Sequence, residues 1–137
     1  ENLRIKLDKS LPQLKGAYIA EVSGLKKIGL KGLKECIIKA HTNWNLKIAT
    51  SELNSWLERK KGEHSPPTNK EKRRIKLKYV VQTRSRPPTL TIFTSYNASV
   101  PDSYRKYLQN SLRKDFNIYG TPIRIFFKSG NNPYKRN

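Results

Sequence analysis

The 137-residue sequence has little cysteine, no methionine and no long apolar run. Its single cysteine, Cys36, cannot form an internal disulfide, and its apolar neighbours at helical spacing indicate a small buried side chain in a reducing compartment. No stretch approaches the roughly 18 consecutive apolar residues of a membrane-spanning helix, and the N-terminus lacks a signal-peptide layout. These absences argue against a secreted or membrane-bound chain and predict a cytoplasmic chain cut from a longer protein.

Acidic residues are also scarce. Lys and Arg number 29 against 10 Asp and Glu, which gives a net charge of +19. The excess is uneven: residues 1–45 carry nine basic and four acidic residues (+5), and residues 46–137 carry 20 and six (+14). Such a positive field attracts phosphate polymers, so we expect a nucleic-acid partner at the second segment. A compositional drift toward lysine is the alternative explanation.

Catalytic and phosphate-binding motifs are missing as well. There is no G-x-x-x-x-G-K-[ST] loop and no N-K-x-D element, so the chain has no cradle for a nucleotide phosphate or its Mg²⁺. The two histidines, His41 and His64, have no carboxylate at useful spacing. We therefore predict no catalytic residues, no metal site, no small-molecule substrate and no enzymatic activity. A basic ribonuclease is kept as a hypothesis that an RNA-cleavage assay tests.

The pattern of apolar residues divides the chain into two parts. In the first, residues 2–11 predict a short helix, residues 17–23 a buried strand and residues 28–44 a second helix. Such a run is a piece of an α/β sheet, because one strand cannot be covered on both faces by these helices alone. In the second part, the pattern predicts helices over about 50–61 and 101–116, and strands over 75–82, 89–95 and 123–128. This α-β-β-α-β order predicts an α+β module with a small mixed three-stranded sheet.

Alternation within these elements assigns side chains to faces. On the first strand, Tyr79 is predicted to point to the apolar face and Val80 to the opposite face. On the helix over 101–116, Lys106 and Arg113 are predicted on the outer side. On the last strand, one face carries Ile123, Ile125 and Phe127, and the other Arg124, Phe126 and Lys128.

Several segments of the second part resemble one protein family. Residues 43–57 (NWNLKIATSELNSWL), the Tyr79-x-x-Gln82 pair with Arg86-Pro87-Pro88-Thr89, residues 103–110 (SYRKYLQN) and residues 120–124 (GTPIR) are similar, in this order and spacing, to the C-terminal part of bacterial Der-type (EngA-type) ribosome-assembly GTPases. The resemblance implies a KH-like domain over 46–137 and, over 1–45, the C-terminal remnant of the second G domain.

The resemblance also carries expectations about ligands and partners. Ser23 and Gly24 match the vestigial guanine-base element of that G domain. GTP and Mg²⁺ are expected in the parent protein's G domains, with no cofactor in this fragment. The family acts in large-subunit ribosome biogenesis, so the resemblance implies a module that faces RNA or the ribosome and regulates the G domains. Ribosomal RNA or the large ribosomal subunit, and the parent's own G domains, are the expected partners. A free-standing basic nucleic-acid-binding module is the alternative.

The candidate RNA-binding residues are the basic side chains of the second part. KH domains that grip RNA use a G-x-x-G loop, but the match over 29–32 lies outside residues 46–137. Basic residues interleaved with Phe126 suit phosphate contact plus base stacking. The alternative for this face is packing against the parent's G domains. The candidates are Lys72, Arg73, Arg74, Lys76, Lys78, Arg84, Arg86, Lys106, Arg113 and Arg124.

Overall fold

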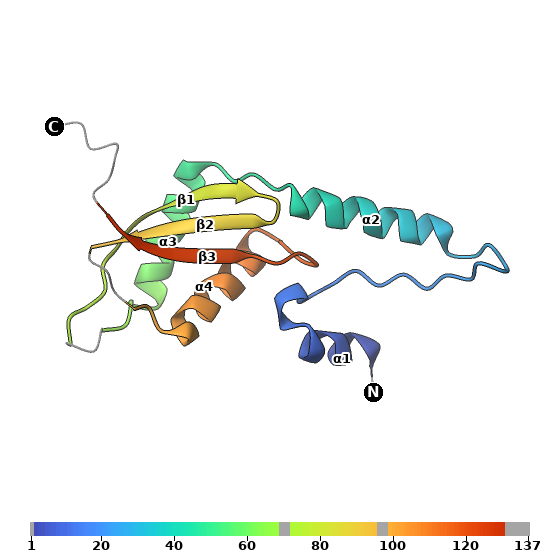
Figure 1. The fold of residues 1–137 in the computed structure, drawn as a ribbon, viewed down its shortest axis with the longest axis horizontal. Helices are drawn as coiled ribbons and strands as arrows, with labels where there is room; N and C mark the ends of the chain where they lie inside the picture. The colour runs from blue at the N-terminus through green and yellow to red at the C-terminus, as the bar shows by residue number, and fades with distance from the viewer. Residues whose placement is uncertain (1, 69–71, 96–98, 131–137) are drawn as a thin grey trace.

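A computed structural model describes residues 2–68, 72–95 and 99–130, shown as a ribbon in Figure 1. The predicted α+β fold with a mixed three-stranded sheet is confirmed, as is the α-β-β-α-β order of the second part. None of the described helices is long and apolar enough to cross a membrane. The elements are α1 (Leu3–Ser10), η1 (Pro12–Leu14), α2 (Leu30–Trp44), α3 (Thr50–Glu63), β1 (Leu77–Ser85), β2 (Pro88–Thr94), α4 (Asp102–Asp115) and β3 (Arg124–Ser129).

The first part is a pair of helices joined by extended chain. The prediction of a buried strand over residues 17–23 is wrong, because no described strand pairs with them and only an isolated bridge joins Ser23 to Ile28. A strand needs a neighbour to satisfy its backbone groups, and the apolar pattern alone does not supply one. Neither α1 nor α2 contains a buried residue.

The sheet has the order β1-β2-β3, with β2 in the centre. β1 runs antiparallel to β2, and the two are joined by a short turn after Ser85. β3 runs parallel to β2, and α4 makes the crossover between them that a parallel pair requires.

A register shift corrects the predicted faces of β1. The pairing with β2 slips between Leu77 and Tyr79, so Lys78 is an extra residue on this strand. A bulge of this kind reverses the alternation beyond it. Val80, predicted to face outward, is therefore fully buried. Tyr79 instead stacks on Phe93 of β2, with ring centroids 4.4 Å apart and 11° between the ring planes.

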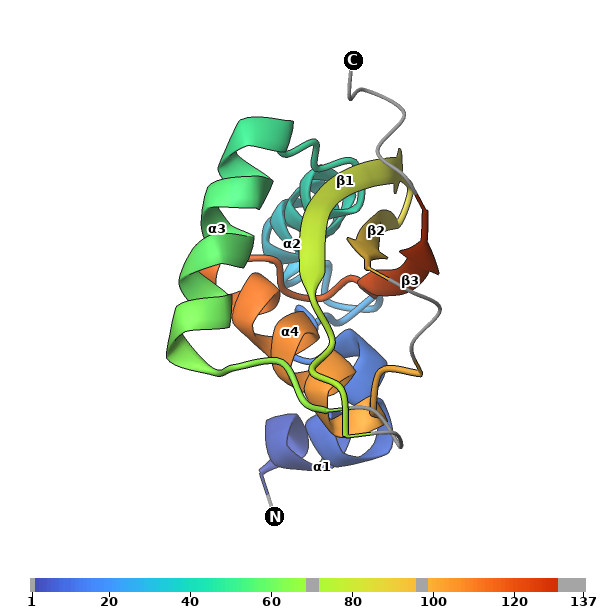
Figure 2. The same ribbon diagram turned by 90° about the vertical axis from the view of Figure 1, so that its left-hand side faces the viewer.

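The core lies between the sheet and a layer of two helices. α3 contributes Leu53, Trp56 and Leu57, and α4 contributes Leu108 and Leu112, all fully buried. Figures 1 and 2 show α3 and α4 on one side of the sheet and no described helix over the other side. The sheet thus has one face in the core and one open face.

An ion pair fastens the two core helices together. Lys60 Nζ of α3 lies 2.9 Å from Asp115 Oδ2 of α4, which also accepts a hydrogen bond from Trp56 Nε1 at 3.2 Å. The hydrogen bond from Lys60 is the main cause that lowers the pKa of the Asp115 carboxyl, and hydrogen bonds to Glu63 and Asp115 raise the pKa of Lys60. Glu63 and Asp115 of the helical layer are therefore both paired with Lys60.

Candidate nucleic-acid interface

The open face of the sheet is built as three rows that cross the strands. Pairing places Arg84, Thr89 and Arg124 in one row, and Val81, Thr91 and Phe126 in the next. The third row contains Tyr79, Phe93 and Lys128. Leu90 and Ile92 of the central strand point into the core, so the residues between them face the other way.

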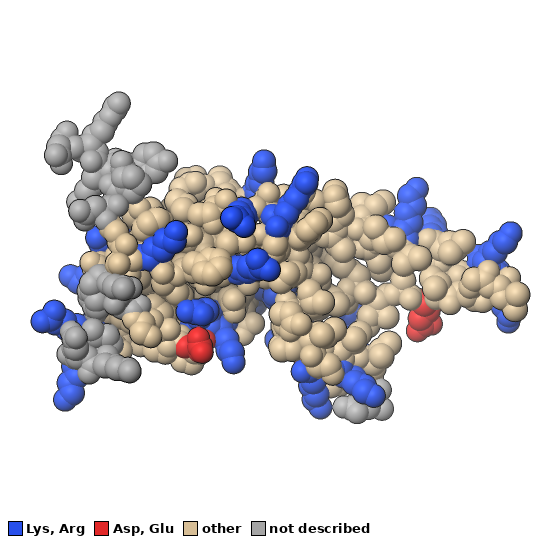
Figure 3. Space-filling model, in the orientation of Figure 1, with Lys and Arg blue, Asp and Glu red and all other residues tan. Residues whose placement is uncertain are grey.

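This face carries positive charge, and its three strands contribute no carboxylate. Every charged residue within 72–101 and within 116–137 is Lys or Arg, so none of the three strands contributes an acid. The space-filling view of Figure 3, which faces the open side of the sheet, shows several separate Lys and Arg side chains among uncharged surface over the strands, with one acidic group near the lower edge. Positive charge on a solvent-facing surface suits phosphate oxygens.

The predicted basic residues fall into separate groups. Arg84 and Arg124 are exposed and flank the start of β2 on the open face. Arg86 is exposed in the turn that follows β1, and its Nε donates a hydrogen bond to Asn45 Oδ1. At the opposite end of β1 stands an exposed group of Lys72, Arg73, Arg74, Lys76 and Lys78.

Two candidates on α4 lie apart from the sheet face. Lys106 is exposed on the helical layer, at the groove between α4 and α1. Arg113, predicted on the outer side of the helix, is instead only 6% exposed. Its guanidinium donates to the carbonyls of Ile118 at 2.9 Å, Thr121 at 3.0 Å and Gln13 at 3.3 Å. Arg113 is therefore removed from the RNA-binding candidates, because it is buried and bound to backbone carbonyls.

Two features of the region were missed by sequence reasoning. The stacked pair of Tyr79 and Phe93 was hidden by the bulge at Lys78, which no local pattern signals. Arg105 of α4 lies with its guanidinium carbon 5.7 Å from the ring centroid of Phe127. This cation–π contact depends on the crossover that brings α4 beside β3.

The comparisons with known proteins fit this geometry. The sequence model of the family described as "KH-domain-like of EngA bacterial GTPase enzymes, C-terminal" matches residues 47–128. The chain belongs to this family. It is 42% identical over 137 residues to the GTPase Der of Jannaschia sp. (strain CCS1), and 43% identical over 134 residues to that of Rhizobium etli (strain CIAT 652). Each alignment covers 98% of this chain and 28% of the relative, so the chain spans about a quarter of the length of these relatives.

The family model covers residues 47–128 and does not include Ser23 and Gly24. The role of these two residues as a vestigial guanine-base element therefore remains a prediction. Ser23 and Gly24 lie in a turn that the Ser23–Ile28 bridge closes, and Ser23 Oγ accepts a hydrogen bond from the Lys26 amide at 3.2 Å. No atom lies within 4 Å of a Cβ placed on Gly24, so this backbone is open to solvent. Among the described residues, no group of three or more His, Cys, Asp or Glu is placed to hold a metal ion.

The first part is held on the KH-like part by hydrogen bonds to the end of α4 and to the loop that follows it, in addition to the bond between Arg86 and Asn45. Asn43 Nδ2 donates to the carbonyl of Tyr119 at 2.9 Å, and the Gly120 amide donates to the carbonyl of Lys15 at 3.3 Å. Arg113 adds its bond to Gln13. These contacts join residues that lie 76 to 105 positions apart in the sequence, and β3 begins directly after this loop.

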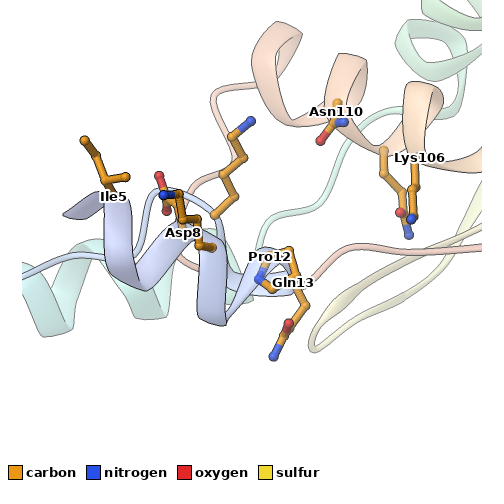
Figure 4. Close-up of a pocket in the computed structure, with 9 residues that line it drawn as sticks. Ile5, Asp8, Pro12, Gln13, Lys106 and Asn110 are labelled. Carbon is orange, nitrogen blue, oxygen red and sulfur yellow. The ribbon is translucent and has the colours of Figure 1, made fainter. Parts of the chain in front are cut away.

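A groove lies between α1 and α4, as the close-up in Figure 4 shows. Its volume is about 600 Å³ and its lining mixes charged and amide side chains. Asp8, which lines it, accepts a hydrogen bond from the Gly16 amide at 3.0 Å. The lining comprises Ile5, Asp8, Lys9, Pro12, Gln13, Lys15, Lys106, Gln109 and Asn110.

Proposed function

We propose that this chain is the RNA-facing C-terminal part of a GTPase that acts in assembly of the large ribosomal subunit in the bacterial cytoplasm. The observation that carries the proposal is the open face of the sheet, where Arg84, Arg124 and Lys128 stand without any carboxylate on the three strands. Ribosomal RNA is the abundant polyanion that such a face would meet. GTP and Mg²⁺ belong, on this proposal, to G domains of the parent protein outside these residues.

The parent's own G domain is the second proposed partner. Nearly all exposed large apolar side chains of the described residues lie between Leu3 and Trp44, including Leu25 at 95%, Ile28 at 61% and Ile37 at 59%. So many exposed large apolar side chains within one segment are unusual for a surface that stays in contact with water. It supports the proposal that residues 1–45 pack against the remainder of a G domain, as the 28% coverage of the relatives suggests.

The RNA proposal is tested by binding to ribosomal RNA and to purified large subunits at several salt concentrations. The Arg84→Glu plus Arg124→Glu variant changes the open face, and Lys106→Glu plus Lys114→Glu makes the same charge change on exposed positions of α4. We expect the first pair to weaken binding at low salt at least tenfold and the second to have a much smaller effect. The slope of log affinity against log salt should become shallower by roughly 0.7 to 0.9 for each phosphate that a variant no longer neutralises.

Equal losses from both pairs would place the binding in the overall charge and not on the sheet. No loss from either pair would leave the module as a protein-docking element for the parent's G domains. In that case the basic face serves solubility, and the RNA proposal is abandoned.

A further inference from the structure

Phe126 is an unusual residue of the open sheet face. Its side chain is 52% exposed, and every other exposed large apolar side chain of the described residues lies between Leu3 and Trp44. It stands in the middle row, beside Thr91 of the central strand. The ring is therefore presented to solvent from a rigid strand, with no described helix to cover it.

Cations stand on both sides of this ring along the same strand. Arg124 and Lys128 precede and follow Phe126 by two positions, so all three side chains leave the same face at intervals of roughly 6 to 7 Å. Arg84 lies across the sheet in the same row as Arg124. Both flanking residues are exposed.

A second aromatic group lies at the end of the open face that is opposite to Arg84 and Arg124. Tyr79 and Phe93 stack on each other with nearly parallel rings, in the row that ends at Lys128. Because each ring packs on the other, the pair provides a rigid apolar surface in the row next to that of Phe126. The arrangement offers an apolar ring face bordered by positive charge.

An aromatic ring face next to cations is complementary to an unpaired nucleotide. Single-stranded RNA presents base faces that stack on aromatic side chains and phosphates that pair with Arg and Lys. A duplex hides its base faces within the helix, and its phosphates alone would leave the exposed ring unused. The carboxylates of an acidic protein segment would also pair with these Lys and Arg side chains, but such a segment offers no planar ring at regular spacing.

We propose that the open face of the sheet is a stacking site for unpaired RNA, with Phe126 beneath one base and Arg124 and Lys128 on the neighbouring phosphates. The inference rests on the proposed RNA-facing function and adds to it the state of the RNA that is recognised. It assigns binding to the sheet surface in a KH-like domain that has no G-x-x-G loop within residues 46–137.

The test compares an oligoadenylate of about ten nucleotides, within the usual site size of single-strand binders, with an RNA duplex of the same length. Fluorescence anisotropy at low salt measures the affinity of the full chain for each. We expect Phe126→Ala to weaken oligoadenylate binding about tenfold and to leave duplex binding unchanged. Phe126→Trp, which keeps a stacking surface, should bind the oligoadenylate at least as well as the native chain.

Any one of these results would overturn the stacking site: no binding of oligoadenylate by the native chain, a duplex affinity equal to or above the single-strand affinity, no effect of Phe126→Ala, or equal losses in Phe126→Ala and Phe126→Trp. The Arg84→Glu plus Arg124→Glu variant distinguishes failure of the RNA-facing function from failure of the stacking site. If that variant loses RNA while Phe126→Ala does not, the RNA-facing function stands and the stacking site falls. If an acidic peptide such as polyglutamate competes with oligoadenylate at equal phosphate and carboxylate charge, recognition is by charge alone and the stacking site falls too.

Discussion

Replacement of Arg113 by methionine should destabilise the protein without weakening RNA binding. Native Arg113 is 6% exposed, and its guanidinium donates to three backbone carbonyls, two of which belong to Ile118 and Thr121, themselves 0% and 3% exposed. Methionine keeps most of the apolar stem but cannot donate a hydrogen bond. Burial lowers the pKa of this guanidinium from its ordinary value, yet the group stays charged at any pH used for folding studies.

The magnitude follows from the two carbonyls that would be left without a partner. Each buried, unsatisfied polar group costs roughly 1 to 3 kcal/mol, so the free energy of unfolding should fall by about 2 to 6 kcal/mol. This is a large part of the stability of a domain of this size, which is on the order of 5 to 15 kcal/mol. The third bond, to Gln13, would free the segment around η1 from the α4–β3 loop.

Urea unfolding followed by tryptophan fluorescence measures this effect, with Trp56 in the core as the main reporter. Lys106→Met is the matched control, since Lys106 is exposed on the same helix and its loss should change stability by no more than about 0.5 kcal/mol. A cost of less than about 1 kcal/mol for Arg113→Met would refute the buried network. So would a loss of RNA affinity equal to that of Arg84→Glu plus Arg124→Glu, because it would place the guanidinium at the surface.

Two further changes test other parts of the structure. In Asp115→Asn, the free energy of unfolding should depend less steeply on pH in the acid range. The native carboxyl pKa lies below its ordinary value of 3.8, so its stabilising contribution is present above that value and is lost as pH falls through the native pKa. Urea unfolding at a series of pH values from neutral to acid checks this. A pH dependence that is unchanged in Asp115→Asn but altered in the exposed control Asp102→Asn would contradict the prediction. Gly29→Ala should open the turn before α2, because Gly29 has φ +83° and an added Cβ would lie 2.1 Å from the Glu21 carbonyl oxygen. Faster hydrogen exchange of the Ile28 amide would show this; Gly24→Ala, which meets nothing within 4 Å, is the control, and equal exchange in the two variants would argue against strain at Gly29.

Local sequence patterns were sufficient for the order of the elements in the second part. The apolar spacing over residues 50–61 predicted α3, on which Leu53, Trp56 and Leu57 are buried. The alternation of Ile123, Ile125 and Phe127 predicted the buried side of β3. Both patterns have short periods that follow directly from helix and strand geometry. The open side of β3, with Arg124, Phe126 and Lys128, was predicted by the same alternation, and all three are exposed.

Contacts between distant segments decided what the patterns could not. The bulge at Lys78 depends on how β1 meets β2, and it moved Val80 into the core and Tyr79 out of it. Arg113 has the spacing of a surface residue on α4, but the loop that follows and the carbonyl of Gln13 enclose it. Residues 17–23 have the composition of a strand without a partner strand to complete it.

The sequence by itself determined that this chain carries an α-β-β-α-β module with a large positive charge and no phosphate-binding loop, because composition and periodicity are local properties. Only the tertiary structure decided which basic residues share a surface, since that depends on strand register and on the crossover that places β3 beside β2. Arg84 and Arg124 lie on one face with Phe126, whereas Arg113 is buried and donates hydrogen bonds to backbone carbonyls. A charge is assigned to a surface or to the interior by its neighbours in space, and those neighbours come from parts of the chain that no short pattern connects.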